Sequence, residues 1–176
     1  IIKYINLTPN YHYDRINEKK ENKLMEKIDL HIHTNISDGT LTPNQVIDIA
    51  KNNKISTISI TDHDTTDAYT KELKQYAKEN NIKLISGVEI SAKKNKIGVH
   101  ILGYNLDISN KFLQNELYKI RNSRHIYLHD VSEKLKNLGY KINTSKLDEI
   151  DTVSKAHIAL DVIKNIKNKE LLIKTF

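Results

Sequence analysis

The sequence predicts an α/β fold built on a parallel sheet. Short segments rich in β-branched residues alternate with segments of helical spacing through the first part of the chain. Strands that alternate with helices in this way are typical of parallel sheets with right-handed crossovers. Polar side chains stand where several of these strands end, which is where parallel barrels gather their reactive groups.

The first strand is expected over residues 27–33. Polar and apolar residues alternate there with a period of two, so His31 and His33 point to the same side. A turn containing Ser37, Asp38 and Gly39 follows.

The first helix is expected to run from Pro43 to about Asn53. Thr42 and Gln45 have the spacing of a capping box, and Pro43 takes the first helical position. The apolar side chains expected to be buried are Val46, Ile49 and Ala50.

Three further strands and one helix complete this part. The expected elements are a strand over 55–61, a helix over about 67–80, a strand over 82–90, and a strand over 96–102 that pairs as a hairpin after a turn at 93–95.

The pattern then becomes helical. A long helix is expected over 110–138, with its apolar residues ending at Leu138 and Gly139 as the cap, and a shorter helix over 155–165. The alternation of strands and helices therefore ends after about four strands. Either a helical insertion separates them from strands beyond Phe176, or the later strands are missing.

These patterns divide the chain into three regions. The only methionine, Met25, directly precedes the first strand, so residues 1–24 are interpreted as an extension outside the fold. Residues 25–108 form the expected N-terminal part of a metal-binding domain, and residues 109–176 form the expected helical insertion region, with truncation of that region as an open alternative.

Composition restricts the chemistry. The chain has no cysteine, so any metal ion must be held by imidazole and carboxylate groups. No apolar run or leader pattern suggests a membrane span or signal peptide, and a cytoplasmic protein is expected. The net charge of +6 follows a general abundance of lysine and indicates no particular partner.

Imidazole and carboxylate side chains recur at separate strand ends. Such a set suits more than one divalent ion, with Glu89 as the candidate bridge, and is compatible with Mn²⁺, Fe²⁺ or Zn²⁺. Asp62 and Asp64 flank His63 and are expected to orient it or to cap the next helix. The alternatives are exposed strand histidines, a plain turn residue at Asp38 and a solvated carboxylate at Glu89. His12, His125 and His129 are interpreted as ordinary surface histidines.

The motifs Asp-x-His-x-His-Thr, Ser-Asp-Gly, Thr-Asp-His-Asp-Thr, Gly-x-Glu and His-x-Leu-Gly-Tyr follow one another over about residues 27–104. This series resembles the polymerase and histidinol phosphatase (PHP) superfamily, and most closely its small stand-alone nucleotide phosphoesterases. The resemblance implies the N-terminal part of a distorted (β/α)7 barrel and a centre of two or three metal ions, often manganese. The ligands it implies are His31, His33, Asp38, His63, Glu89 and His100.

A later motif, Ser154 to Ala159, partly matches a Gly-Arg-Pro-His-Ile-Ala segment of these relatives. It makes His157 a candidate seventh ligand and Lys155 a candidate phosphate-binding group, although lysine lacks the planar fork of arginine. Arg121 and Arg124 either face phosphate or form a solvated surface. A further histidine and an Asp-x-His pair, which relatives carry late in the chain, are absent after His157.

The expected function is therefore metal-dependent hydrolysis of phosphate esters in nucleotides or short oligonucleotides, by a water that the metal ions activate. No protein partner is indicated. Two alternatives remain: a truncated, catalytically silent metal-binding or interaction module, and the PHP domain of a DNA polymerase.

Overall fold

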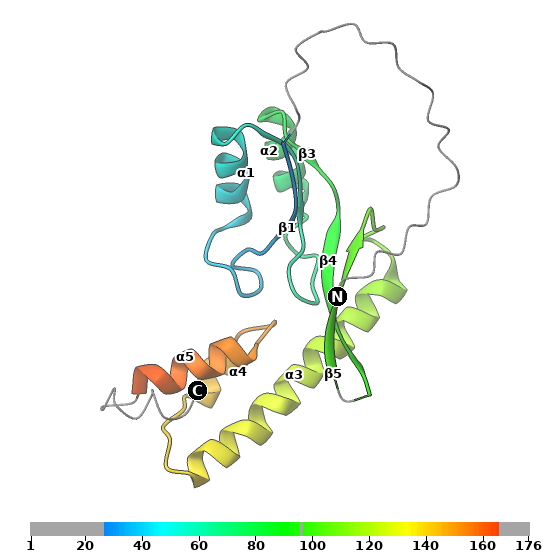
Figure 1. Ribbon diagram of the computed structural model, residues 1–176. Coiled ribbons are helices and arrows are strands. Elements are labelled where there is room, and N and C mark those ends of the chain that lie inside the picture. The colour runs from blue at the N-terminus through cyan, green and yellow to red at the C-terminus, as the bar shows by residue number, and fades with distance from the viewer. Residues whose placement is uncertain (1–26, 96, 166–176) are drawn as a thin grey trace, which may run out of the picture.

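The structure, a computed structural model, describes residues 27–95 and 97–165. The extension expected over residues 1–24 lies outside these ranges. The described chain has a part built from strands and two short helices, followed by a part built from three helices (Figure 1).

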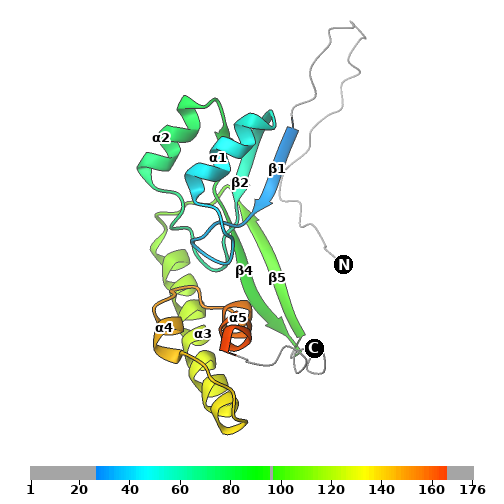
Figure 2. The same cartoon turned by 90° about the vertical axis from the view of Figure 1, so that its left-hand side faces the viewer.

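The first part contains the expected parallel sheet. Its strands β1 (Lys27–Ile32), β2 (Ile55–Ile60) and β3 (Lys83–Leu84) pair in the order β1-β2-β3, and both pairs are parallel. Helices α1 (Pro43–Asn52) and α2 (Lys71–Glu79) are the crossovers, and both lie on the same side of this sheet (Figure 2). The prediction of alternating strands and helices is confirmed.

Helix α1 begins as predicted but buries a different face. Both hydrogen bonds of the Thr42–Gln45 capping box are present, and Pro43 opens the helix. The buried residues are Val46, Ile47 and Ala50. The expectation for Ile49 is wrong, since this side chain is 44% exposed. The buried arc is centred between Val46 and Ile47, which turns Ile49 to the solvent side.

Helix α2 begins at Lys71, later than the predicted start near Asp67. Thr70 is the N-cap, and its hydroxyl accepts a hydrogen bond from the backbone N–H of Leu73. The residue before the cap, Tyr69, is turned inward and only 6% exposed. Burying this large side chain requires a turn ahead of the helix, in which the Tyr69 N–H bonds to the Thr66 carbonyl.

The Tyr69 hydroxyl also explains why the strand expected over 82–90 is divided. It lies 2.6 Å from the Ile60 carbonyl and 2.8 Å from the Ile85 carbonyl, and it accepts from the Gly87 N–H at 2.8 Å. The Tyr69 hydroxyl thus replaces backbone hydrogen bonds that would otherwise pair β2 with the segment around Ile85 and Gly87. The chain resumes regular structure as β4 (Gly87–Lys94).

We expect Tyr69→Phe to destabilise the protein by about 1–3 kcal/mol, because it leaves buried backbone groups without a partner. The ring is kept, so lost packing contributes little. Urea unfolding followed by circular dichroism measures the change. Tyr76→Phe is the matched control, since it removes a single, only partly buried side-chain hydrogen bond, the one to Asp48. Equal effects of the two substitutions would contradict the bridging role of Tyr69.

Strand β4 forms the predicted antiparallel hairpin with β5 (Ile97–Tyr104). The hairpin is joined to the parallel sheet by a parallel bridge between His63, just after β2, and Glu89. The carboxyl end of β2 therefore lies beside the start of β4.

The second part contains the long helix α3 (Lys111–Asn137) and the shorter helices α4 (Thr144–Asp148) and α5 (Lys155–Asn165). Asn110 caps α3, and Gly139 follows its end with a φ of +85°, as predicted. Leu138 is 73% exposed, since it lies at the last turn, beyond the packed section of the helix. A separate small core is formed by Leu128, Leu147, Val153 and Ile158.

Hydrogen bonds connect the helical part to the segments that follow β1 and β2. The Gln114 side chain donates to Thr66 at 2.8 Å, and the Thr152 hydroxyl donates to the Ile36 carbonyl at 3.0 Å. The head of the β1 arrow points toward helices α3 to α5 (Figure 2). Within the described ranges, none of the helices combines the length and apolar character of a membrane span.

Candidate metal centre

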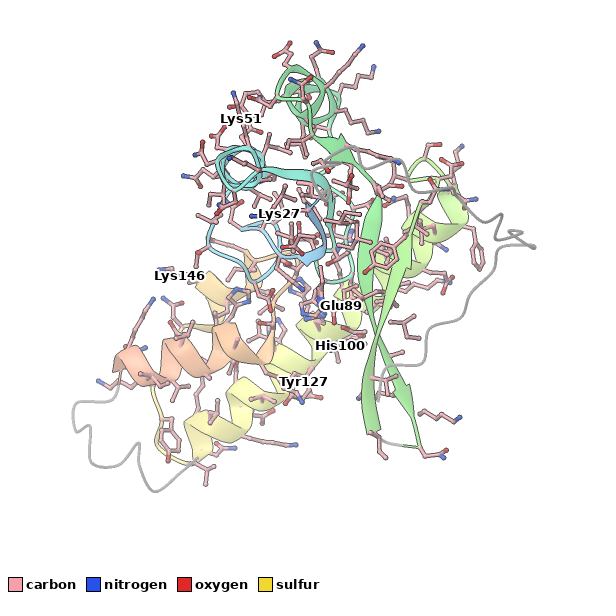
Figure 3. The ribbon with its side chains drawn as sticks, turned by 45° about the horizontal axis from the view of Figure 1, so that its top comes forward. Lys27, Lys51, Glu89, His100, Tyr127 and Lys146 are labelled. Carbon is pink, nitrogen blue, oxygen red and sulfur yellow. The ribbon has the colours of Figure 1, made fainter. Side chains whose placement is uncertain are left out.

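Side chains from four strands meet at one end of the sheet. His31 and His33 come from β1 and its end, His63 follows β2, Glu89 belongs to β4 and His100 to β5. Glu89 and His100 lie near one another beside α3 (Figure 3).

Backbone pairing brings these residues together. The Glu89 N–H donates to the Asp62 carbonyl at 3.2 Å, and the Asp64 N–H donates to the Glu89 carbonyl at 2.9 Å, so His63 lies beside Glu89. In the hairpin, Glu89 pairs with Leu102. His100 is two residues from that partner and is the diagonal neighbour of Glu89 on the same face.

The turn after β1 delivers Asp38. Gly39 lets the turn fold back on the strand, because a Cβ at this position would lie 2.5 Å from the His33 carbonyl oxygen. The Gly39 N–H donates to the Thr34 carbonyl at 2.9 Å. As a result, Asp38 Oδ1 lies 3.0 Å from His33 Nδ1 and Oδ2 lies 3.5 Å from His63 Nε2.

Glu89 is the centre of the arrangement. One carboxylate oxygen lies 2.9 Å from His31 Nε2 and 2.8 Å from His33 Nε2, and the other lies 2.8 Å from His100 Nδ1. Three overlapping groups have ligand atoms within 4.8 Å of one another: His31, His33 and Glu89; His33, Asp38 and His63; His63, Glu89 and His100. The six residues predicted as one set are therefore in one place.

This donor set fits divalent metal ions. Among the described residues, His63 Nδ1 is buried and makes no hydrogen bond, and His33 Nδ1 is buried with only the ion-pair contact to Asp38. Buried polar atoms of this kind normally have a partner, and a metal ion would supply one. Nitrogen and carboxylate ligands suit Mn²⁺, Fe²⁺ and Zn²⁺.

The ionisation of the cluster also favours cations. Burial lowers the pKa of His63, although Asp38 and Glu89 oppose this effect, so its imidazole stays neutral at neutral pH. Burial raises the pKa of Glu89, but the hydrogen bond from His31 and the charges of His63 and His33 outweigh it and hold that pKa below its ordinary value. A neutral imidazole and an ionised carboxylate are the forms of these two groups that bind metals.

Asp62 supports the centre differently from the expectation. Its carboxylate accepts from the Thr34 N–H at 2.7 Å, the Thr34 hydroxyl at 2.6 Å and the Ser37 hydroxyl at 2.6 Å. Asp62 is 1% exposed. It therefore holds the turn that carries Asp38, rather than His63 itself.

Asp64 connects the centre to the helical part. Its side chain is fully buried and accepts from the Ser91 N–H at 2.6 Å and from Arg124 Nε at 2.9 Å. Arg124 also reaches Asp64 with Nη2, the Ser91 hydroxyl at 2.8 Å and the Val153 carbonyl at 3.2 Å. The carboxylate thus joins the loop after β2, strand β4 and helix α3.

Neither arginine forms the solvated surface that was one alternative for them. Arg121 donates to the Asp64 carbonyl at 2.8 Å and its Nε lies 2.7 Å from Asp151. The side chains of Arg121 and Arg124 are 12% and 18% exposed. Sequence reasoning missed this anchoring role because the partner of Arg124 lies 60 residues away.

The partly matching motif lies on α5. The Ser154 N–H donates to His157 Nδ1 at 3.1 Å, so the neutral ring carries its hydrogen on Nε2. Burial lowers the pKa of His157, while Asp38 raises it and Arg124 lowers it. Lys155 is exposed, and its Nζ lies 5.8 Å from the centre of the Tyr127 ring.

Comparison with known proteins agrees with this geometry. The PHP domain family matches residues 29–175, which is most of the chain. The chain belongs to the PHP domain family. The predicted resemblance is therefore confirmed, and the candidate metal-binding groups lie on the segments that carry its motifs. The expectation that Glu89 ends its strand is wrong, because the interruption before Gly87 makes it the third residue of β4.

The proteins to which the chain is similar include an exoribonuclease and a phosphatase. The chain is 34% identical over 136 residues to the 5′-3′ exoribonuclease Rnm of Escherichia coli, covering 74% of this chain and 46% of the relative. It is 38% identical over 100 residues to a 3′,5′-nucleoside bisphosphate phosphatase of Chromobacterium violaceum, covering 57% and 35%. The chain thus spans less than half the length of these two relatives.

A solved PHP-like structure has the same fold. An amidohydrolase from Chromobacterium violaceum, solved with bound sulfate and no metal, superimposes with a TM-score of 0.72 at 28% identity. The match covers 85% of this chain and 55% of that one. The α/β fold class is confirmed.

Proposed function

We propose that this chain supplies the metal-binding part of a phosphoesterase that acts on nucleotides or short oligonucleotides. The observation that carries the proposal is the convergence of five imidazole- or carboxylate-bearing residues from β1 and its end, β4, β5 and the end of β2, together with Asp38, into overlapping groups within 4.8 Å. The printed activities of the relatives, an exoribonuclease and a nucleoside bisphosphate phosphatase, support nucleotide esters as substrates.

In this proposal His31, His33, Asp38, His63, Glu89 and His100 hold the ions. Each neutral imidazole donates one lone pair to one metal, so His33 and His63 cannot serve all three groups at once. The described residues therefore favour two ions with Glu89 shared between them, and manganese is the proposed metal. Paired ions of this kind lower the pKa of a coordinated water and bind the oxygens of a phosphate ester.

The remaining polar groups act on the substrate or the scaffold. His157 carries its hydrogen on Nε2 and is suited to donate to a phosphate oxygen, which we favour over a role as seventh ligand. Lys155 supplies an exposed positive charge beside it. Asp62, Asp64, Arg121 and Arg124 are assigned to positioning, because their polar atoms already contact protein groups.

We further infer that strands β1 to β5 are the first part of a distorted (β/α)7 PHP barrel. Residues 25–108 would form the metal-binding domain and residues 109–176 the helical insertion. Two separate hydrophobic cores support this division, one among the strands, α1 and α2, and the other among α3, α4 and α5.

The test is release of phosphate from a nucleoside 3′,5′-bisphosphate by the full chain, after treatment with EDTA and again after Mn²⁺ is restored. We expect activity to be lost with the metal and to return with Mn²⁺. A catalytically silent module would instead bind Mn²⁺ in stoichiometric amounts and release no phosphate. That result would refute the proposal for this chain while leaving the metal centre intact.

A further inference from the structure

The connection between helices α4 and α5, residues 149–154, contacts the segments that carry two of the candidate metal ligands. It lies beside the turn that follows β1 (Figures 1 and 2). Thr152 and Val153, in the middle of the connection, are each 1% exposed. Connections between helices normally run over the surface, so two consecutive buried residues indicate that this one is held in place.

Thr152 contacts the turn that delivers Asp38. Its hydroxyl donates to the carbonyl of Ile36, two residues before Asp38, at 3.0 Å. The same turn is held from the other side, because the Ile36 N–H donates to the Thr34 hydroxyl at 3.2 Å and Thr34 in turn donates to the buried carboxylate of Asp62. A hydroxyl from the helical part thus joins a hydrogen-bond network that supports a candidate metal ligand.

The next residue contacts the segment that carries His63. The Val153 carbonyl accepts from Arg124 Nη1 at 3.2 Å. The same arginine pairs with Asp64, which directly follows His63 in the chain. Consecutive residues of the connection therefore contact the turn after β1 directly and the loop after β2 through one arginine.

The two contacted segments supply ligands to the same metal-binding group. Asp38 Oδ2 lies 3.5 Å from His63 Nε2, and both residues form a group with His33. The connection also leads directly into α5, which carries His157. Burial lowers the pKa of His157 and the charge of Asp38 raises it, so the start of α5 lies within electrostatic reach of this group.

We propose that Thr152 is a positioning residue that couples metal binding by the group of His33, Asp38 and His63 to the placement of α5. A metal ion held by this group fixes the turn that carries Asp38, and the Thr152 hydrogen bond extends this restraint to the connection and to the start of α5. Such coupling is reciprocal, so docking of α5 raises the affinity for the metal by the same factor. The inference rests on the proposed metal centre, but not on hydrolysis of phosphate esters.

Hydrogen exchange of the full chain, metal-free and with saturating Mn²⁺, tests the coupling without any substitution. We expect Mn²⁺ to slow exchange of the backbone amides in residues 152–160 as well as in the turn at 34–39, because the two segments open together. Slowing confined to residues 27–104 would overturn the proposal. A chain that binds Mn²⁺ and releases no phosphate refutes the proposed activity alone, whereas a chain that binds no Mn²⁺ refutes the metal centre and this coupling together.

Thr152→Val removes the hydroxyl and keeps the branched shape of the side chain. We expect the affinity of the centre for Mn²⁺ to fall about fivefold or more, since coupled sites typically change one another's affinity by roughly 5- to 150-fold. The slowing of exchange in α5 by Mn²⁺ should disappear. Thr152→Ser keeps the hydroxyl and should restore both properties.

Thr144→Val is the matched control in the helical part, because the Thr144 hydroxyl is buried but makes no hydrogen bond to any described residue. Calorimetry measures Mn²⁺ binding, and circular dichroism establishes that each variant is folded. Equal Mn²⁺ affinity in Thr152→Val and Thr144→Val would overturn the proposal. Slowing in α5 that survives in Thr152→Val would also overturn it, since His157 would then contact the metal directly. If Thr152→Val does not fold, the exchange of the unaltered chain and of Thr152→Ser decides.

Discussion

Replacing His33 with alanine is expected to remove Mn²⁺ binding at the main centre and to reduce phosphate release below detection. His33 belongs to two of the three metal-binding groups, with Nδ1 beside Asp38 and Nε2 beside Glu89. Loss of a group that only supports a ligand typically costs 10- to 100-fold in metal affinity, so we expect loss of a ligand to cost more than about 100-fold. Calorimetric titration with Mn²⁺ and a phosphate-release assay measure the two effects.

His100→Ala provides a graded comparison on the same centre. His100 belongs to one group only, and its side chain is 54% exposed. We expect a smaller loss of Mn²⁺ affinity than for His33→Ala, with both variants folded by circular dichroism. Unchanged Mn²⁺ binding in His33→Ala would remove the basis for assigning this cluster as the metal centre.

Replacing Arg124 with leucine is expected to destabilise the protein by about 3–5 kcal/mol, because it leaves the carboxylate of Asp64 buried without its ionic partner. Asp64 is fully buried and makes its only described ion pair with Arg124. This loss is a large fraction of the roughly 5–15 kcal/mol that stabilises an ordinary domain. The free energy of unfolding in urea measures it.

The double variant Arg124→Leu with Asp64→Asn separates buried charge from lost packing. Asparagine keeps an acceptor for the Ser91 N–H and tolerates the positive φ of 56° at this position, but carries no charge. We therefore expect the double variant to be more stable than Arg124→Leu alone.

Lys119→Leu is the matched control on the same helix. It breaks an exposed pair with Glu116, which should cost less than about 1 kcal/mol. If Arg124→Leu were no more destabilising than Lys119→Leu, the Asp64–Arg124 contact would not anchor the helical part to the metal centre.

The fold class could be predicted because it depends on local patterns, and the set of six candidate ligands followed from the resemblance of the motifs to the PHP family. Strand periodicity places His31 and His33 on one side of β1, and parallel pairing brings the ends of successive strands to one edge. The capping residues Thr42 and Asn110 likewise mark helix starts through contacts within a few residues.

Contacts between distant segments could not be predicted in this way. The interruption before β4 depends on Tyr69, whose hydroxyl contacts groups 9 to 18 residues away. The buried face of α1 depends on how the helix packs on the sheet, and apolar spacing alone wrongly favoured Ile49. The contacts of His125 and His129 with Asp148 likewise depend on packing, because a separate helix, α4, brings Asp148 to them.

The sequence by itself thus determined the alternation of strands and helices, the family motifs and the residue types that can bind metal at the strand ends. These features are encoded by neighbours in the chain, through periodicity and capping. Only the tertiary structure decided that Asp64 is neutralised by Arg124 and that two histidines of α3 contact the carboxylate of Asp148. Each of these depends on side chains far apart in sequence, whose proximity comes from packing.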